Sequence, residues 1–298
     1  MILVTGATGQ FGSRAVDHLL GKGINPLVVS VLVRDITTAN HLKDKGIKVK
    51  IGDYNEYDSM VEAFSGVDKL LLVSSNNREA IENRTRHHKN AIKAAKKAEV
   101  NHIIYTSFVR NTGFENSAIS DFQNSHVETE RYLKESGVTY TILQNAIYAE
   151  MIPAFVGDKV TETGTILFPA GEGKASWTLR EELAEAAANI LMTNGHEDKT
   201  YTLTNTESIG FNSIAQYMSE TLGIKVLYKS LEGDEFKATL MKTGVQEKYI
   251  DMLKMWGAAL EQQTMDKQDD TLSKILNRKP TQIKKFIERN YSQKQILK

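Results

Sequence analysis

The sequence predicts an α/β fold: a doubly wound parallel sheet, followed by a smaller and mainly helical region toward the C-terminus. Two observations predict it. Short, solidly apolar runs alternate with longer amphipathic ones through the first half of the chain, a pattern typical of parallel strands that helices cover on both faces. The first apolar run is followed directly by a glycine-rich segment that opens an amphipathic stretch, which indicates a tight turn from a strand into a helix.

The apolar runs are expected to form the strands of this sheet, at residues 2–4, 27–33, 47–51, 69–73, 102–106 and 140–143. Helices are expected between them, at residues 12–20, 38–45, 57–64, 81–98 and 122–136. Gly46, Gly66 and Gly137 follow three of these helices, where glycine commonly ends a helix. Because strands and helices alternate, right-handed crossovers should make the strands parallel.

The rhythm of the sequence changes after Asn145. Residues 151–177 are rich in glycine and proline and indicate loops, whereas a helix at 181–192 and a strand at 200–203 are expected to rejoin the sheet. We therefore expect a first domain of residues 1–150 to which residues 178–205 return. Residues 151–177 and 206–298 should form a substrate or lid region that is mainly helical, with one further strand near 224–228.

Composition excludes several classes of function. The chain of 298 residues has a formal net charge of zero, which gives no electrostatic reason to expect nucleic-acid binding. It has no cysteine, so disulfides, thiolate nucleophiles and cysteine metal sites are excluded. No apolar run is long enough to span a bilayer, and the first strand leaves no room for a secretory signal. We expect a cytoplasmic monomer or homodimer that binds neither membrane nor nucleic acid.

The segment GATGQFG at residues 6–12 follows the first strand and opens the first helix. A dinucleotide pyrophosphate needs a tight turn, a backbone that it can approach closely, and free N–H groups at a helix N-terminus. Gly6, Gly9 and Gly12 supply the first two, and the helix supplies the third. The sequence therefore predicts that residues 1–150 form a Rossmann domain that binds NAD(P).

Polar residues at the ends of the next strands bear on the choice of cofactor. Arg34 and Asp35 follow the second strand, where arginine accommodates the 2′-phosphate of NADPH and a carboxylate binds the free 2′-hydroxyl of NADH. Arg34 favours NADPH, and Asp35 keeps NADH as an alternative. Asp53 follows the third strand and should either border the adenine or cap the next helix. Ser74 and Ser75 follow the fourth strand and should border the ribose-phosphate arm.

These residues also carry a family resemblance. Most of residues 1–205 is covered, in order, by the stretches VTGATGQFG, VLVRD, GDY, VDKLLLVSS, AAKKAEVNHIIYTS, HVETERYLKESGVTYTILQNAIYAE, GEGK and NGHEDKTYTLTN. The chain resembles the NmrA-like branch of the atypical short-chain dehydrogenases/reductases, and within it the NAD(P)H:quinone oxidoreductases of type 2 and the triphenylmethane reductases.

The resemblance implies which residues contact the cofactor. They lie in the glycine turn, after the second, fourth and sixth strands, and after the GEGK turn, and in this chain they are Gly6, Thr8, Gly9, Gln10, Phe11, Gly12, Arg34, Ser74, Ser75, Asn145, Tyr148 and Arg180. Asn145, Ala146 and Tyr148 would lie at the nicotinamide ring, so Asn145 and Tyr148 would also border the site of hydride transfer. For Tyr148 the alternative is a half-buried core aromatic.

Ordinary short-chain dehydrogenases donate a proton from the tyrosine of a Tyr-x-x-x-Lys pair. Here Ser107 ends the fifth strand, but the following helix offers His126 and Glu130 at that spacing, so the tyrosine-lysine acid is missing. A quinone tolerates this absence because its hydroquinone anion is weakly basic, and a triphenylmethane cation needs only a hydride. His126 could still donate a proton, or it could hydrogen-bond to Glu130 one turn later.

We therefore expect an enzyme, an NADPH-dependent reductase that transfers hydride directly to a quinone-like acceptor without flavin or metal. A non-catalytic NADP(H) redox sensor of the NmrA type and a triphenylmethane-dye or azo reductase are the alternatives. Phe108, Phe155 and Trp177 are expected to form either core or the apolar walls of the acceptor site. Adjacent His87 and His88 project about 100° apart on a helix, so they cannot easily bind one metal ion together. With Arg84, Arg86 and Lys89 nearby, they indicate a solvated face rather than a metal site.

Overall fold

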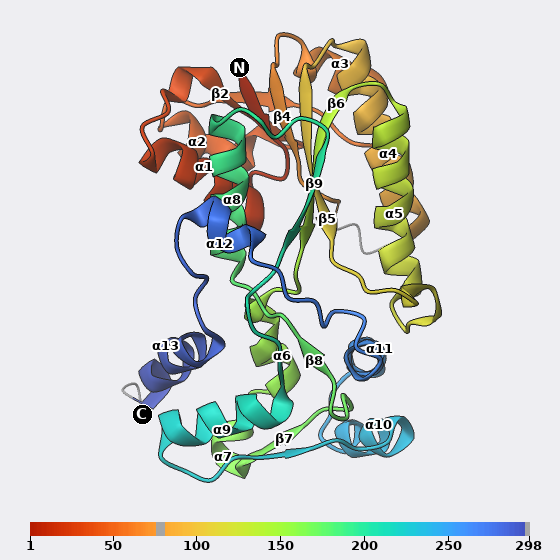
Figure 1. The fold of residues 1–298 in the computed structure, drawn as a ribbon, viewed down its shortest axis with the longest axis vertical. Coiled ribbons are helices and arrows are strands. Elements are labelled where there is room, and N and C mark those ends of the chain that lie inside the picture. Colours follow the sequence, from red (N-terminus) through yellow and green to blue (C-terminus); the bar gives the residue numbers. More distant parts are fainter. Residues whose placement is uncertain (76–80, 296–298) are drawn as a thin grey trace.

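The computed structural model describes residues 1–75 and 81–295. Its centre is a seven-stranded sheet with the strand order β3-β2-β1-β4-β5-β6-β9 (Figure 1). Every neighbouring pair of strands is parallel, which confirms the predicted doubly wound parallel sheet. The strands are β1 (Ile2–Val4), β2 (Val29–Val33), β3 (Lys48–Ile51), β4 (Lys69–Leu72), β5 (His102–Phe108), β6 (Thr139–Asn145) and β9 (Lys199–Leu203).

Helices cover both faces of the sheet, as solidly apolar strands require. One face packs on a layer that comprises α1 (Gln10–Gly21), α2 (Asn40–Lys43), α8 (Arg180–Met192) and α12 (Thr271–Leu276). The other packs on α3 (Tyr57–Phe64), α4 (Ile81–Lys97) and α5 (Ser120–Glu135). The chain order reverses between β1 and β4, and ligands of doubly wound sheets bind beyond the carboxyl ends of the strands at such a switch point.

Some predicted boundaries were wrong for local reasons. The second strand begins at Val29 rather than at residue 27, because Pro26 opens a short 3-10 turn that the Asn25 side chain caps through the Leu27 N–H at 3.0 Å. The helix predicted at 38–45 is a 3-10 turn at Ile36–Ala39 followed by the single turn of α2. The fifth and sixth strands each run two residues further than predicted, because their polar ends pair with each other through the backbone.

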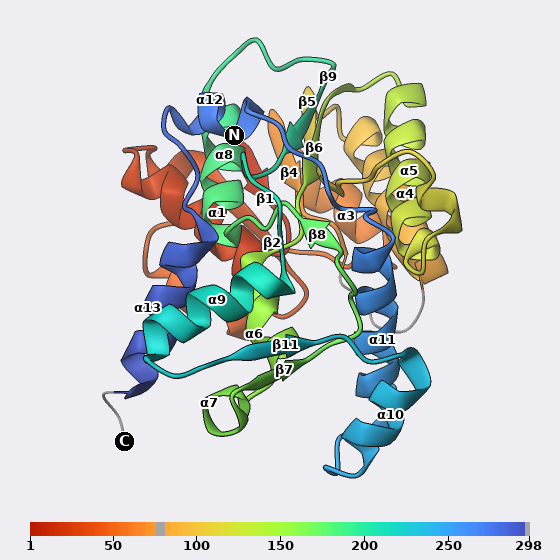
Figure 2. The same cartoon turned by 60° about the horizontal axis from the view of Figure 1, so that its bottom comes forward.

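The remaining residues form a second region below the sheet, around an aromatic core (Figures 1 and 2). β7 (Thr165–Leu167) pairs in parallel with β11 (Leu227–Lys229), which lies three residues beyond the start of the strand predicted at 224–228. β8 (Lys174–Ala175) pairs antiparallel with β10 (Ile209–Gly210). The helices of this region are η4 (Ala149–Met151), α6 (Ile152–Val156), α7 (Val160–Thr163), α9 (Phe211–Leu222), α10 (Gly233–Met241), α11 (Glu247–Glu261) and α13 (Ile283–Gln295).

All three aromatic residues considered for the acceptor site, Phe108, Phe155 and Trp177, belong to this core. Phe155 is 2% exposed and stacks on Phe168 with 4.8 Å between ring centroids. Trp177 is 1% exposed, and its indole N–H donates to the Ile209 carbonyl at 3.1 Å. Both side chains therefore hold the second region together.

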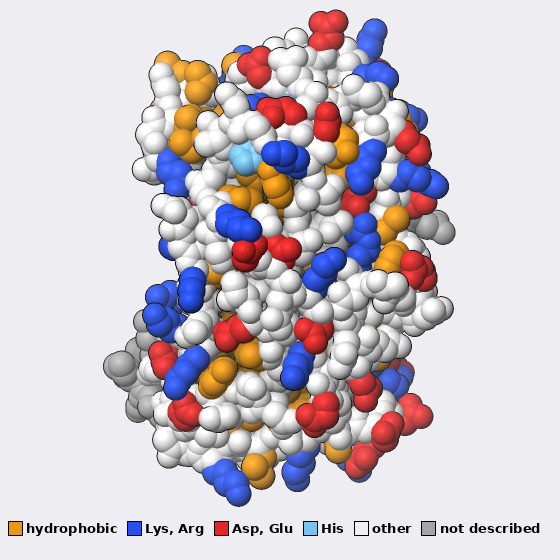
Figure 3. Space-filling view, viewed as in Figure 1, with side chains coloured by type: hydrophobic (Ala, Val, Ile, Leu, Met, Phe, Trp, Pro, Cys, Tyr) orange, Lys and Arg blue, Asp and Glu red, His pale blue; other side chains and the backbone are white. Residues whose placement is uncertain are grey.

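The surface bears on binding partners. Figure 3 shows that Lys and Arg side chains are interspersed with Asp and Glu on the described part of the face it draws, so this face offers no concentrated positive field for a phosphate backbone. No helix in the described ranges combines the length and the apolar character that crossing a bilayer requires.

The buried Glu182 ties the C-terminal part of the chain to α8. It is 2% exposed, and its Oε1 accepts hydrogen bonds from Arg278 Nη1 at 2.6 Å and from the Thr281 N–H at 2.9 Å. The substitution Glu182→Ala leaves these two donors without their acceptor. It should lower the free energy of unfolding by about 2 kcal/mol, measured by chemical denaturation.

Glu181→Ala is the matched control for this prediction, because Glu181 is the preceding residue of the same helix and its side chain is 39% exposed. Its partners Arg14 and His18 have side chains that are 52% and 22% exposed, so its substitution should change the free energy of unfolding by no more than about 1 kcal/mol. Equal effects of the two substitutions would contradict the role given to Glu182.

Candidate cofactor and active site

The glycine turn folds tightly between β1 and α1. Gly6 has φ +61°, a backbone conformation that favours glycine, and the Gly9 N–H donates to the Gly6 carbonyl at 2.9 Å. A Cβ at Gly12 would stand 2.7 Å from the Gly6 carbonyl carbon and 2.9 Å from the Ala7 nitrogen. Only glycine therefore fits at residue 12 without moving the turn.

The N-terminus of α1 is open to a ligand. Its N-cap residue is Gly9, no side chain caps it, and no acidic residue stands in its first turn. The first helical bond runs from the Ser13 N–H to the Gly9 carbonyl, so the N–H groups of residues 10–12 have no partner within the helix. Thr8 and Gln10 are exposed, whereas the Phe11 side chain is 6% exposed in the core, which leaves only its backbone for a ligand. This end of the helix is suited to an anion.

Arg34 and Asp35, the two residues after β2, differ in whether their side chains are free to bind a ligand. The Asp35 carboxylate accepts hydrogen bonds from the Thr37 hydroxyl at 2.7 Å and from the Thr37 N–H at 2.9 Å, and these bonds lower the pKa of Asp35. Arg34 is exposed and forms no ion pair with any described residue. The guanidinium is thus free to bind a phosphate, while the carboxylate is engaged by its own turn.

The Asp53 side chain shapes the turn after β3 rather than capping a helix. Its Oδ1 accepts from the Asn55 N–H at 2.8 Å, and the N-cap residue of α3 is Glu56. The prediction of a helix cap at Asp53 was therefore wrong, because the helix starts one turn later. Asp53 remains half-buried at the carboxyl end of the strand.

Ser74 and Ser75 are half-buried beyond the end of β4. The Ser74 N–H donates to the Thr106 hydroxyl at 2.8 Å, and the Ser75 N–H donates to His88 Nε2 at 2.8 Å. These bonds connect β4 to β5 and α4 at the edge of the sheet where a cofactor is expected, and they fix the two serines in place.

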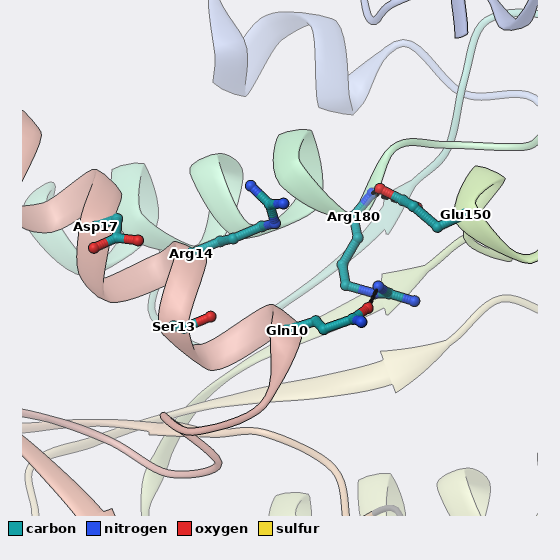
Figure 4. Close-up of a pocket in the computed structure, with 6 residues that line it drawn as sticks. All are labelled: Gln10, Ser13, Arg14, Asp17, Glu150 and Arg180. Atoms are coloured by element: carbon teal, nitrogen blue, oxygen red, sulfur yellow. Dashed lines mark hydrogen bonds between the residues drawn. The ribbon is translucent and has the colours of Figure 1, made fainter. Parts of the chain in front are cut away.

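Three residues from distant parts of the chain meet at the end of β6. The Arg180 guanidinium lies over the Tyr148 ring, with its Cζ 4.5 Å from the ring centroid. Arg180 Nη1 also donates to the Gln10 side-chain oxygen, and Figure 4 shows these two side chains pointing toward each other. The start of α8 thus links the glycine turn to Tyr148.

An open cavity of about 520 Å³ lies beside this link (Figure 4). Its lining is polar and consists of Gln10, Ser13, Arg14, Asp17, Glu150 and Arg180. The Glu150 carboxylate accepts from the Arg180 backbone N–H at 3.0 Å, which caps the start of α8 and leaves the Arg180 guanidinium to face the turn. The cavity therefore adjoins the open N-terminus of α1.

Asn145 carries a buried amide at the end of β6. The residue is 1% exposed, and neither Oδ1 nor Nδ2 has a hydrogen-bond partner of normal geometry among the described residues. Burial raises the pKa of the neighbouring Tyr148 hydroxyl, and this effect outweighs the Arg180 charge and the Asn145 amide, which both lower that pKa. A buried, unpaired amide is costly, so its position indicates a ligand with matching donors and acceptors.

Ala146, next along the chain, is also 1% exposed, and its N–H donates to the Leu203 carbonyl at 3.0 Å.

His126 is buried and its two ring nitrogens are occupied. Nε2 lies 3.4 Å from Arg84 Nη1, and because arginine can only donate, Nε2 accepts. The ring proton then sits on Nδ1, which donates to the Tyr105 hydroxyl at 2.8 Å. Burial and the Arg84 charge lower the pKa of His126 well below its usual range. The imidazole is neutral, with one fixed tautomer.

Glu130 does not form the hydrogen bond to His126 that was one of the two expectations. Its carboxylate pairs with Arg110 through two bonds of 2.7 and 2.8 Å, and it accepts the proton of the Ser107 hydroxyl. Ser107, the residue that would face a substrate in an ordinary short-chain dehydrogenase, is thus engaged by a carboxylate. Geometry explains the difference, because α5 directs Glu130 toward β5 and β6 rather than along its own axis.

Arg84, His87 and His88 of α4 are buried, so the prediction of a solvated face was wrong for these three residues, although Arg86 beside them is exposed. The exposed fractions of the three buried residues are 9%, 4% and 0%. A signal was present in the sequence, because Arg84 and His88 continue at helical spacing the stripe of Ala91 and Ala95 that packs on the sheet. The described residues hold no group of three or more His, Asp or Glu side chains arranged to bind a metal ion.

The strand order, the switch point and the glycine turn define a Rossmann-like α/β protein. Residues 1–287 match the NmrA-like family. Quinone oxidoreductase 2 of Escherichia coli (strain K12) is 32% identical, over 94% of this chain and 95% of that protein. The NAD(P)H azoreductase of Xenophilus azovorans is 29% identical over 85% of each. The crystal structure of Citrobacter sp. triphenylmethane reductase complexed with NADP(H) is 34% identical, with a TM-score of 0.89 over 97% of this chain and 99% of that one. The chain belongs to the NmrA-like family.

Proposed function

We propose that this protein is an NADPH-dependent reductase that transfers hydride directly from the nicotinamide to a quinone-like acceptor. The observation that carries the proposal is the buried amide of Asn145, which has no hydrogen bond of normal geometry among the described residues. It stands beside Tyr148, which Arg180 and Gln10 link to the glycine turn. A single extended ligand with an anionic group in its middle and an amide at one end would suit both the glycine turn and the Asn145 side chain. The name of the Escherichia coli relative and the NADP(H) complex of the Citrobacter reductase support the same reading.

Different residues of this chain bind different parts of NADPH. The open N-terminus of α1 receives the pyrophosphate, and Arg34 pairs with the 2′-phosphate. Ser74 and Ser75 border the ribose-phosphate arm, and Asp53 borders the adenine. Asn145 and Tyr148 orient the nicotinamide end, next to the Ala146 backbone. The bound nicotinamide supplies the hydride, so no flavin or metal is needed.

The division of the chain follows from these assignments. Residues 1–150, together with residues 178–205, bind the cofactor, because they hold the glycine turn, Arg34 and Arg180. Residues 151–177 and 206–298 cover the acceptor, except for α12, which packs on α8 and β9 in the cofactor-binding part. Phe108 is 9% exposed and contacts Trp256 of α11 with 6.3 Å between ring centroids, so an aromatic wall joins the two parts.

Neither Ser107 nor His126 is available to replace the missing tyrosine-lysine acid, and this bears on the choice of acceptor. Ser107 is held by Glu130, and His126 is neutral with its proton committed to Tyr105. We therefore give His126 a positioning role rather than that of a proton donor. A ketone would need a strong acid in the transition state, whereas a reduced quinone takes its proton from water. Azo and triphenylmethane dyes share the same hydride transfer and differ in how they fit the pocket.

The test follows NADPH absorbance with purified protein and 1,4-benzoquinone, 2-methyl-1,4-naphthoquinone, a triphenylmethane dye and an azo dye, with NADH in parallel. We expect saturable reduction of a quinone that is faster with NADPH than with NADH. Calorimetric binding of NADPH without reduction of any acceptor would instead favour a redox sensor that responds to NADP(H).

Direct transfer is tested separately with NADPH that carries deuterium at C4 of the nicotinamide. A triphenylmethane cation accepts hydride at its central carbon, where a C–D bond does not exchange with water. We expect mass spectrometry to find the deuterium in the leuco dye from one of the two C4 epimers of the labelled cofactor. Leuco dye without deuterium from either epimer would contradict direct transfer.

A further inference from the structure

Arg84 is a buried cation that has no acidic partner among the described residues. The residue lies on α4 and is 9% exposed, and none of the ion pairs among the described residues includes it. Arg110, by contrast, is neutralised by the two oxygens of Glu130. Burial lowers the pKa of Arg84, which is the physical mark of a charge removed from water. Proteins seldom keep such a charge without a partner or a ligand.

The guanidinium is held in place by neutral groups only. Its Nη1 donates to His126 Nε2 at 3.4 Å, and its Cζ lies 4.6 Å from the centroid of the Phe122 ring. His126 in turn is fixed by Tyr105. A guanidinium has five N–H donors, and no other hydrogen bond from this side chain is formed within the described part of the chain. The Arg84 guanidinium is therefore held in one orientation, while most of its N–H groups have no acceptor among the described residues.

An aromatic cluster stands beside the cation. Phe108 of β5, Phe122 of α5 and Trp256 of α11 meet edge to face, with ring centroids 5.0, 5.7 and 6.3 Å apart. The Arg84 charge also acts on Tyr148, whose pKa burial raises and Arg180, Asn145 and Arg84 lower. Arg84 thus lies within electrostatic reach of the place proposed for the nicotinamide, next to a wall that suits a flat aromatic ring.

We propose that Arg84 binds an anionic oxygen on an aromatic acceptor, which makes acidic hydroxyquinones the preferred substrate class of this site. The proposal rests on the proposed function. When the hydroxyquinone anion receives a hydride, it gains two electrons and one proton, so its product carries negative charge on two oxygens. The guanidinium pairs with the oxygen that was anionic from the start, and water later protonates the other.

The test compares two quinones of similar size in the presence of NADP⁺, so that binding is measured without turnover. The 2-hydroxy-1,4-naphthoquinone is an anion at neutral pH, and 2-methyl-1,4-naphthoquinone is neutral. Quenching of tryptophan fluorescence gives each Kd. We expect Arg84→Met to weaken binding of the anionic quinone by about tenfold or more, and binding of the neutral quinone by less than about threefold. Arg84→Lys should keep part of the preference.

Arg86→Gln is the matched control, because Arg86 lies on the same helix and is exposed, with hydrogen bonds to Asn55 and Asn83 at 3.1 and 2.9 Å. It removes the same charge and should leave both Kd values unchanged. Arg84→Met should also have a Tm no lower than the original protein, since an unpaired buried charge is removed.

Three results would overturn the inference. Arg84→Met could weaken the binding of both quinones equally, or leave both Kd values unchanged, while the original protein binds them. Either result would contradict the role of Arg84 without contradicting the proposed function. Failure of the original protein to bind either quinone, with NADP⁺ bound, would remove the proposed function and this inference together.

Discussion

Gly12→Ala is expected to weaken NADPH binding by about 100-fold, measured by calorimetry. The new methyl group would stand 2.7 Å from the Gly6 carbonyl carbon and 2.9 Å from the Ala7 nitrogen, so the turn has to move. A displaced turn no longer aims the N–H groups of residues 10–12 at one point, and the pyrophosphate loses both its space and its donors. The substitution tests the turn as a binding site rather than as a connection between a strand and a helix.

Gly21→Ala is the control for this prediction. Gly21 ends the same helix, its φ is not in the left-handed region, and nothing lies within 4 Å of the position its Cβ would take. The same chemical change should there leave NADPH affinity unchanged and should, if anything, raise stability. Unchanged NADPH affinity in Gly12→Ala would show that the cofactor binds elsewhere.

Arg34→Ala is expected to change the choice of cofactor. The KM for NADPH should rise by about 10- to 100-fold, because a charge-assisted bond to the 2′-phosphate is lost. The KM for NADH should change little, since the Asp35 carboxylate stays bound to Thr37 and does not become free to take the ribose hydroxyls. Steady-state kinetics with both cofactors measures the two effects.

Arg131→Ala controls for the loss of one surface charge. Arg131 lies on α5 with its side chain 62% exposed and pairs with Glu128 three residues earlier. Its substitution should alter neither KM. A rise in KM that is equal for NADPH and NADH in Arg34→Ala would mean that Arg34 supports the fold of the site rather than the 2′-phosphate.

Most of the fold could be predicted because it depends on local patterns. Apolar runs and glycines located every strand of the sheet, and the helix at Tyr57–Phe64 was predicted to the residue. Errors arose where polar residues join the backbone ladder. Phe108 pairs with Asn145 at the ends of β5 and β6, beyond the apolar runs that marked these strands. A pattern of hydrophobicity cannot show this pairing, because it depends on the partner strand.

The candidate site could be predicted only in part, for a related reason. The glycine turn is contiguous, so its spacing alone indicates a pyrophosphate site. The contact of Arg84 with His126 depends on how α4 packs on α5, across 42 residues of sequence. The unpaired amide of Asn145 is a property of its surroundings, and no residue type signals it. The engagement of Ser107 by Glu130 is likewise visible only in three dimensions.

The late return of the chain to the sheet affects how the protein is made. The glycine-turn helix α1 packs against α8, and β6 pairs with β9, so both need residues beyond 179. On the ribosome, a nascent chain that ends at β6 has already completed its glycine turn but exposes the apolar face of α1 and an open strand edge. The incomplete chain should therefore be most prone to aggregate after β6 has emerged from the ribosome and before α8 and β9 follow.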